Sequence, residues 1–316
     1  MLEKKANLQE GERILKRKKK ASWMRRAFII HCIFIPLVSF TVFYIYVNYR
    51  SILMAFQNRE GQWTMENFVR LYNEVSEGGT YLNTAVRNTL ITFGITLVTF
   101  PVKVCVAYFI YKKVPFYGFY RIMFFLPGII FSVAQSMIIV RMLAPTGQIA
   151  EWVGQMLNLS SAPDLLADSR YANAVVLLHC IWISFPGDLI VWGGTFARIP
   201  EDVLESAWID GVSWWTELTR IIVPLVWPTV SISMIMTVCA LFGASGEAFL
   251  FTGGEYGTET LSSWMYKILI NNSGVMESTN VFNYLSAAGF VMTFISVGLS
   301  LIIRKFIDRA FAEVEY

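Results

Sequence analysis

The chain has 316 residues, of which 55% are hydrophobic and 16% are charged, and its mean hydropathy is +0.50. A soluble domain of this length cannot bury so much apolar surface, so the composition excludes soluble enzymes and soluble binding modules and indicates an integral membrane protein. The formal net charge of +3 hides a steep asymmetry, because basic residues crowd the beginning of the chain.

Apolar stretches long enough to cross a bilayer recur along the chain, and their lengths favour helices over barrel strands. The six expected spans cover residues 27–47, 88–110, 122–143, 172–192, 226–251 and 283–303. The sequence therefore predicts an all-α polytopic membrane protein with six transmembrane helices. In this division, 48–87 is an outer segment and 88–303 is a five-helix core.

Residues 1–26 form a basic tail before the first span. Its basic residues are Lys4, Lys5, Arg13, Lys16, Arg17, Lys18, Lys19, Lys20, Arg25 and Arg26. Such a cluster orients the first span with its basic end in the cytoplasm, and alternate counting then places both termini there, including the tail 304–316. The cluster could instead bind nucleic acid or anionic lipid, but a juxtamembrane run of this kind is most often an orientation signal. We expect no nucleic-acid partner.

Isolated polar residues inside the expected spans have ordinary structural explanations. Lys103 lies about two turns from the cytoplasmic end of the second span, so we expect its ammonium group to reach that interface along its own stem. The four cysteines lie in spans without CxxC spacing, which argues against a disulfide framework or a metal site. His31 and His179 are expected to pack within the spans.

A short acidic helix is expected in the cytoplasmic loop 193–225, between the fourth and fifth spans. Pro200 suits the first helical position, and the acidic residues that follow it favour the positive end of the helix dipole. Val203, Leu204, Ala207 and Trp208 place an apolar stripe on one face. A polar helix between two strongly apolar spans must be presented to something in the cytoplasm.

The end of this helix is also marked in the sequence. Gly211 can adopt the left-handed conformation that stops a helix, and the next helix should begin near Ser213. Pro224 should end or bend that helix before the fifth span.

The fifth span contains small residues at 243–246, followed by Glu247. Small residues let helices pack closely, or they leave room along a solute path with the carboxylate near its outer mouth. The two interpretations can hold on different faces of one helix. The candidate path residues follow helical spacing and are Met236, Cys239, Ala240, Gly243 and Glu247.

The segment 199–228 resembles the cytoplasmic loop motif of ABC importer permeases. The motif here reads Glu205-Ser206-Ala207, then Asp210-Gly211, then Ile221-Ile222-Val223-Pro224, with Ser206 and Val223 as small departures from the usual Ala and Leu. Asn88-Thr-Leu90, the stretch from Phe119 to Pro127 and Thr252-Gly-Gly254 look like the carbohydrate-uptake members, of the MalF-like type, although Glu255 replaces the usual Pro. The resemblance covers the chain from about residue 82 onward.

This resemblance implies a type I ABC importer permease fold in a bacterial plasma membrane. It implies transport of a carbohydrate, an oligosaccharide in particular, together with a second homologous permease, two ABC ATPase subunits and an extracytoplasmic solute-binding protein. The ATPase-coupling residues would be Pro200, Glu205, Ser206, Ala207, Asp210, Gly211 and Pro224. The chain itself would be non-catalytic and hold no cofactor, because ATP and Mg²⁺ would be bound by the ATPases; it has no GxxxxGK[ST] phosphate-binding loop.

Three other functions agree with parts of the sequence. An ABC importer for a non-sugar solute would share every feature above. An ion-coupled secondary transporter would normally show internal hydropathy symmetry and broken helices with ion ligands at the bilayer midplane, and the sequence shows no such symmetry. A membrane-embedded enzyme would need paired titratable residues, and the scattered ones here form no catalytic constellation in the sequence.

Overall fold

The computed structural model describes residues 25–26, 28–78, 81–243, 246–272 and 278–310. Helices dominate these residues, and their β pairing is limited to one isolated bridge between Gln57 and Trp63. The basic tail expected over 1–26 lies almost entirely outside the described residues. Five of the helices are long and apolar enough to cross a membrane, or six if one sharply bent pair counts as a single span.

The first half of the chain begins with a helix over Phe28–Ala55, which includes a π-helical stretch at Phe40–Tyr46 and ends in α2 (Val47–Ala55). The helices that follow are α3 (Glu66–Ser76), α4 (Tyr81–Tyr111), α5 (Tyr117–Ile129), α6 (Ser132–Leu143), α7 (Gln148–Met156), α8 (Ala172–Ile183) and α9 (Phe185–Phe196). The expected outer segment 48–87 contains the end of α2, the whole of α3 and the start of α4.

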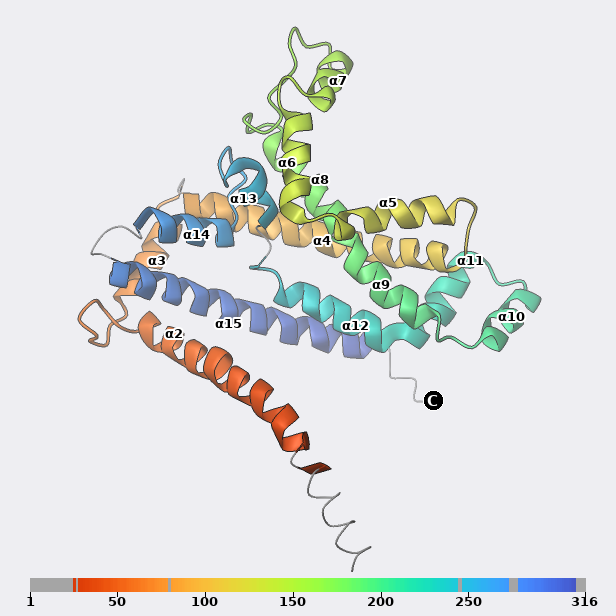
Figure 1. Cartoon of the computed structure of the whole chain (residues 1–316), viewed down its shortest axis with the longest axis horizontal. Coiled ribbons are helices and arrows are strands. Elements are labelled where there is room, and N and C mark those ends of the chain that lie inside the picture. The colour runs from red at the N-terminus through yellow and green to blue at the C-terminus, as the bar shows by residue number, and fades with distance from the viewer. Residues whose placement is uncertain (1–24, 27, 79–80, 244–245, 273–277, 311–316) are drawn as a thin grey trace, which may run out of the picture.

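The second half contains α10 (Glu201–Ile209), α11 (Trp214–Thr216), the π-helix η2 (Glu217–Ile222), α12 (Val223–Cys239), α13 (Gly246–Thr252), α14 (Leu261–Asn272) and α15 (Ser278–Ala310). Figure 1 shows α10 and α11 at one end of the long helices, with α3 and α14 at the opposite end. The loop that carries α10 is thus separated from α3 and α14 by the length of the helical bundle.

The third expected span is broken. α5 and α6 meet at an angle of 107°, because Ile130 and Phe131 have extended backbone angles between them. Pro127 lies inside α5 just before this break, where its ring disturbs the helical hydrogen bonds. As a result α6 leaves the direction of the long helices, and α6 and α7 project to one side (Figure 1).

The fifth expected span, 226–251, is wrong in its bounds. The membrane-length helix runs instead from Trp214 to Cys239, and Ala240 ends it. Apolar composition alone placed the span too late, because the run of apolar residues continues through the turn after Cys239 and into the separate helix α13.

The bundle is held by three clusters of buried apolar side chains. The cluster nearest α10 joins α4, α9, α12 and η2 through large side chains such as Tyr108, Trp192, Phe196 and Ile222. A second joins the start of α4 to α14 and α15, and a third lies among α6, α7, α8 and α13. The helix Phe28–Ala55, in contrast, has no buried residue in its most apolar stretch, as a lipid-facing or partner-facing helix would.

Candidate coupling loop and transmembrane polar network

The loop between α9 and α12 presents α10 with well-formed ends. Pro200 has an extended ψ of 134° and therefore caps the helix from outside, rather than occupying the first helical position as the sequence suggested. At the other end, Gly211 has φ +67, its N–H donates to Trp208 O, and the N–H of Val212 donates to Ala207 O. This is the Schellman arrangement, so the left-handed stop expected at Gly211 is present.

The next helix also starts where expected. The Ser213 hydroxyl accepts a hydrogen bond from Thr216 N, which caps the short helix α11. Pro224, however, does not end the helix that follows, because η2 leads into α12 without a break and Pro224 lies in the first turn of α12. Pro224 lies just after the π-helical stretch, and both a π-helical stretch and a proline interrupt the regular hydrogen bonds of an α-helix.

The two faces of α10 differ from the predicted stripe. Leu204 and Ala207 are buried against the chain's own core, whereas Val203 and Trp208 are exposed. The apolar side chains therefore divide into a pair buried in this chain and a pair whose surfaces are exposed to solvent or to a partner. Glu201, Asp202, Glu205, Ser206, Asp210 and the apolar Ile209 are exposed as well.

Glu217, a residue that the sequence analysis did not single out, ties this loop to the bundle. Its carboxylate Oε1 lies 2.6 Å from Lys112 Nζ, and its Oε2 accepts a 3.4 Å hydrogen bond from the Trp208 indole. The Lys112 ammonium also lies 4.3 Å from the centre of the Trp208 ring, within the range of a cation–π interaction. No local pattern identifies this group, since Lys112 and Glu217 are far apart in the sequence.

A second buried charge pair lies between α4 and α9. Lys103 Nζ is 2.9 Å from Asp188 Oδ2, and the Lys103 side chain is only 3% exposed. The expectation that Lys103 reaches the cytoplasmic interface is therefore wrong. The ammonium group turns to a carboxylate because a charge inside an apolar bundle is far cheaper to keep when it is paired.

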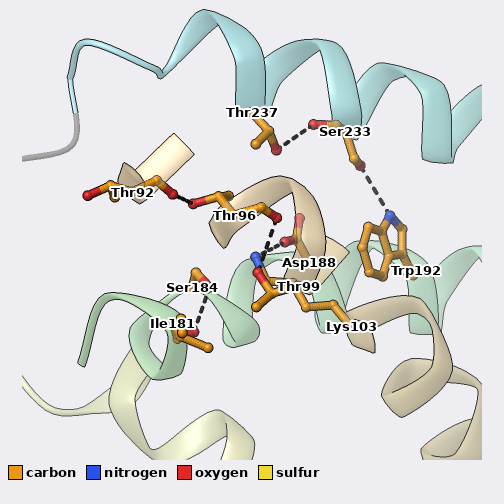
Figure 2. A network of polar contacts seen from close by, with 10 residues as sticks. All are labelled: Thr92, Thr96, Thr99, Lys103, Ile181, Ser184, Asp188, Trp192, Ser233 and Thr237. Carbon is orange, nitrogen blue, oxygen red and sulfur yellow. Dashed lines mark hydrogen bonds and ion pairs between the residues drawn. The ribbon is translucent and has the colours of Figure 1, made fainter. Parts of the chain in front are cut away.

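Hydroxyl groups extend this pair into a polar network (Figure 2). On α4, Thr96 donates to Thr92 O and Thr99 donates to Thr96 O. The Trp192 indole on α9 donates to the Ser233 hydroxyl on α12, and Thr237 donates to Ser233 O. In Figure 2 these side chains from α4, α9 and α12 face one another, so polar groups occupy the junction of three long helices.

The candidate path residues do not share one continuous helical face. Met236 and Cys239 are exposed on α12, Ala240 ends that helix, and Gly243 follows in a turn. The i, i+7 relation from Met236 to Gly243 therefore fails, because the helix stops between them. The side chain of Glu247 lies outside the described residues.

One motif that carried the resemblance holds the loop that follows another, near the first residues of α4. The Asn88 amide donates to Gly257 O at 2.6 Å and to Glu259 O at 2.9 Å, and its oxygen accepts from Asn173. The Thr89 hydroxyl accepts from Leu261 N. The stretch Asn88-Thr-Leu90 therefore fixes the loop that follows Thr252-Gly-Gly254.

No site for a metal ion emerges from the described residues, which contain no cluster of three or more His, Cys, Asp or Glu side chains arranged to bind one. The polar groups that they do bring together are paired charges, hydroxyls and amides. Such groups can hold helices together and can hydrogen bond a polar solute.

Comparison with known proteins places these features among transport permeases. No family model matches the chain. The trehalose transport system permease protein SugA of Mycobacterium tuberculosis is 25% identical over 148 residues, which are 46% of this chain and 48% of SugA. The lactose transport system permease protein LacF of Rhizobium radiobacter is 24% identical over 275 residues, 83% of this chain and 88% of LacF. The match thus spans about half the length of SugA and most of LacF.

A solved structure shows the same fold. One chain in the crystal structure of a bacterial alginate ABC transporter, in complex with an alginate pentasaccharide-bound periplasmic protein, has a TM-score of 0.74 and 19% sequence identity to this chain. The match covers 91% of this chain and 96% of that chain. Together these comparisons confirm the resemblance to carbohydrate-uptake ABC importer permeases that the loop motif carries in the sequence.

Proposed function

We propose that this chain is the transmembrane permease subunit of an ATP-driven, binding-protein-dependent ABC importer that moves a carbohydrate, in particular an oligosaccharide, by alternating access. The observation that carries the proposal is α10, a helix with a Schellman stop at one end of an apolar bundle, with acidic residues and apolar side chains left uncovered. The names of the relatives supply the solute class.

In this proposal the chain crosses a bacterial plasma membrane six times with both termini in the cytoplasm, and the bent pair α5–α6 counts as one crossing. α10 then faces the cytoplasm as the coupling helix. It would dock on an ABC ATPase through its exposed side chains, with Glu205 accepting charge-assisted hydrogen bonds there.

The partners are a second homologous permease, two ATPase subunits and an extracytoplasmic binding protein. ATP and Mg²⁺ would be bound by the ATPases, so this chain would hold no cofactor and catalyse no reaction. ATP-driven closure of the ATPases would bring the coupling helices together, and the bundle would pass between inward-open and outward-open states.

Residues 236–247 remain our proposal for part of the solute path. The break after Cys239 supports it, because a helix interruption inside a membrane is tolerated where the freed backbone lines a polar cavity or is buried in protein. Met236, Cys239, Ala240, Gly243 and Glu247 would then contribute the lining around this break.

The proposal is tested by reconstituting the chain with its partner subunits in vesicles. ATP-dependent accumulation of a labelled oligosaccharide, absent without the binding protein, is the expected result. Uptake of only non-sugar solutes would show that the importer carries another class of solute. Uptake driven by an ion gradient without the ATPases would favour a secondary transporter.

Docking by α10 has its own test. We expect Glu205→Lys to reduce co-purification of the ATPase while the chain still inserts, because Glu205 is exposed and the change leaves the core untouched. Glu255→Lys, an equal charge reversal on an exposed residue at the opposite end of the bundle, is the matched control. Unchanged co-purification with Glu205→Lys would contradict the docking role.

A further inference from the structure

Three segments of the chain meet at the carboxylate of Glu217. Lys112 follows the last residue of α4, Trp208 belongs to α10, and Glu217 begins η2, the helix that returns toward the membrane. Both carboxylate oxygens are used, one by the Lys112 ammonium at 2.6 Å and one by the Trp208 indole at 3.4 Å. We refer to Lys112, Trp208 and Glu217 as the basal cluster.

The two charged side chains of the basal cluster are largely buried, whereas the Trp208 side chain is exposed. The Glu217 side chain is 4% exposed, and the Lys112 side chain is 17% exposed. A buried carboxylate is tolerated only when its charge is paired and its oxygens are hydrogen bonded, so loss of either partner leaves a costly unpaired charge. An exposed ion pair would constrain these segments much less.

The local backbone supports a specialised role for Glu217. The helix that carries it is wound as a π-helix over Glu217–Ile222 before it becomes the α-helix α12. π-helical turns cost stability and occur frequently at functional sites. The side chains of Leu218 and Ile222 are fully buried in the core near α4 and α9. Packing of these two side chains therefore holds the π-helical turn in a defined position.

α4 is the element that receives the contact. It runs without interruption over 31 residues, about 46 Å at the rise of an α-helix, which exceeds the hydrocarbon thickness of a bilayer. Polar contacts occur along its whole length. Lys112, just after its last residue, pairs with Glu217 of η2, and Lys103 in its middle pairs with Asp188 of α9. Near its first residues, Asn88 donates to the carbonyl of Gly257. A displacement of its base is therefore passed along the bundle.

We propose that the basal cluster transmits movement of α10 into α4 and that Lys112 and Glu217 are positioning residues for energy coupling. This inference rests on the proposed function, since it assigns α10 as the coupling helix. Without the cluster, α10 would still pack through Leu204 and Ala207, but its movement would be absorbed by the loops on either side instead of moving α4 and α12 together.

The test measures solute transported per ATP hydrolysed in reconstituted complexes. Glu217→Gln and Lys112→Met should assemble with the ATPases yet lower this ratio at least about fivefold, a coupling change within the usual range for linked sites. Lys113→Met is the matched control, because Lys113 is adjacent and exposed, and it should keep the ratio of the unsubstituted complex.

Two further variants keep the test decisive if a single change prevents folding. Trp208→Phe keeps an aromatic ring for Lys112 but replaces the indole with a smaller ring that has no N–H donor, so it should give a smaller fall in the same ratio. The exchange Lys112→Glu with Glu217→Lys restores the pair and should recover part of the ratio lost by Glu217→Gln.

The outcomes separate this inference from the proposed function. An unsubstituted complex that shows no ATP-driven uptake would contradict the proposed function. A complex that transports normally, and whose Glu217→Gln and Trp208→Phe variants assemble with an unchanged ratio, would overturn the role of the basal cluster alone.

Discussion

Lys103 on α4 and Asp188 on α9 form a buried ion pair, with 2.9 Å between Nζ and Oδ2, at a junction that also includes the hydroxyl groups of α12. The pair joins two helices that are far apart in the sequence, and it does so inside membrane-length helices. An ionised group in such a place is costly unless it is paired, so Lys103 depends on Asp188 for its tolerated burial.

The first prediction compares the loss of stability when one member of the Lys103–Asp188 pair is removed with the loss when both are removed. Asp188→Leu should destabilise the protein by about 3–5 kcal/mol, because it leaves the Lys103 ammonium buried without a partner. The double variant Lys103→Met with Asp188→Leu should be near the stability of the unsubstituted protein, since both charges are gone. Denaturant unfolding in detergent measures both, and additive losses in the double variant would show that the two residues do not interact.

The second prediction concerns the backbone at Gly211, whose φ of +67 favours glycine. Nothing lies within 4 Å of an added Cβ there, so any substitution acts through backbone strain and not through a clash. Gly211→Val should cost about 1–2 kcal/mol locally and reorient α10, with loss of uptake. Asn tolerates this conformation, so Gly211→Asn should retain most uptake; equal loss in both variants would argue against a conformational requirement.

The third prediction concerns Asn88, which holds the loop between α13 and α14 near the first residues of α4. Asn88→Ala removes the donor for Gly257 O and Glu259 O and should cost about 1–3 kcal/mol, because buried acceptors are left unsatisfied. Arg87→Ala, on an exposed neighbour in the same helix, is the control and should change stability little. A thermal unfolding midpoint for Asn88→Ala equal to that of the control would contradict this structural role.

Much of the architecture could be predicted because it depends on local signals. Apolar runs give the long helices, and the position of Gly211 after an amphipathic stretch gives the left-handed end of α10. The bend between α5 and α6 has a local signal too, Pro127, but a single proline does not tell whether a helix kinks slightly or turns by 107°. Hydropathy could not place the end of α12, since the residues after Cys239 are as apolar as those before it.

The polar contacts were harder to predict, since they join distant parts of the chain. Lys103 was visible as a cation in an apolar span, but its partner Asp188 is 85 residues away and was one of several scattered ionisable residues. Glu217 lies in a loop with other acidic residues, and nothing in the sequence distinguishes it as the buried one. Its burial results from the packing of η2 against α4, which local periodicity does not encode.

The last prediction tests the proposed solute path at Gly243. An added Cβ there would meet only Ala240 O, at 3.5 Å, which is an ordinary van der Waals contact, so the backbone leaves room for a side chain to begin. If the break after Cys239 lines the path, Gly243→Phe fills space that the solute needs and should reduce solute-stimulated ATP hydrolysis several-fold while basal hydrolysis persists. Gly118→Phe, at another open and exposed glycine near the start of α5, controls for the bulk of the new side chain. Full stimulation in the Gly243→Phe complex would move the path to another part of the bundle, with the network around Asp188 and Ser233 as the next position to test.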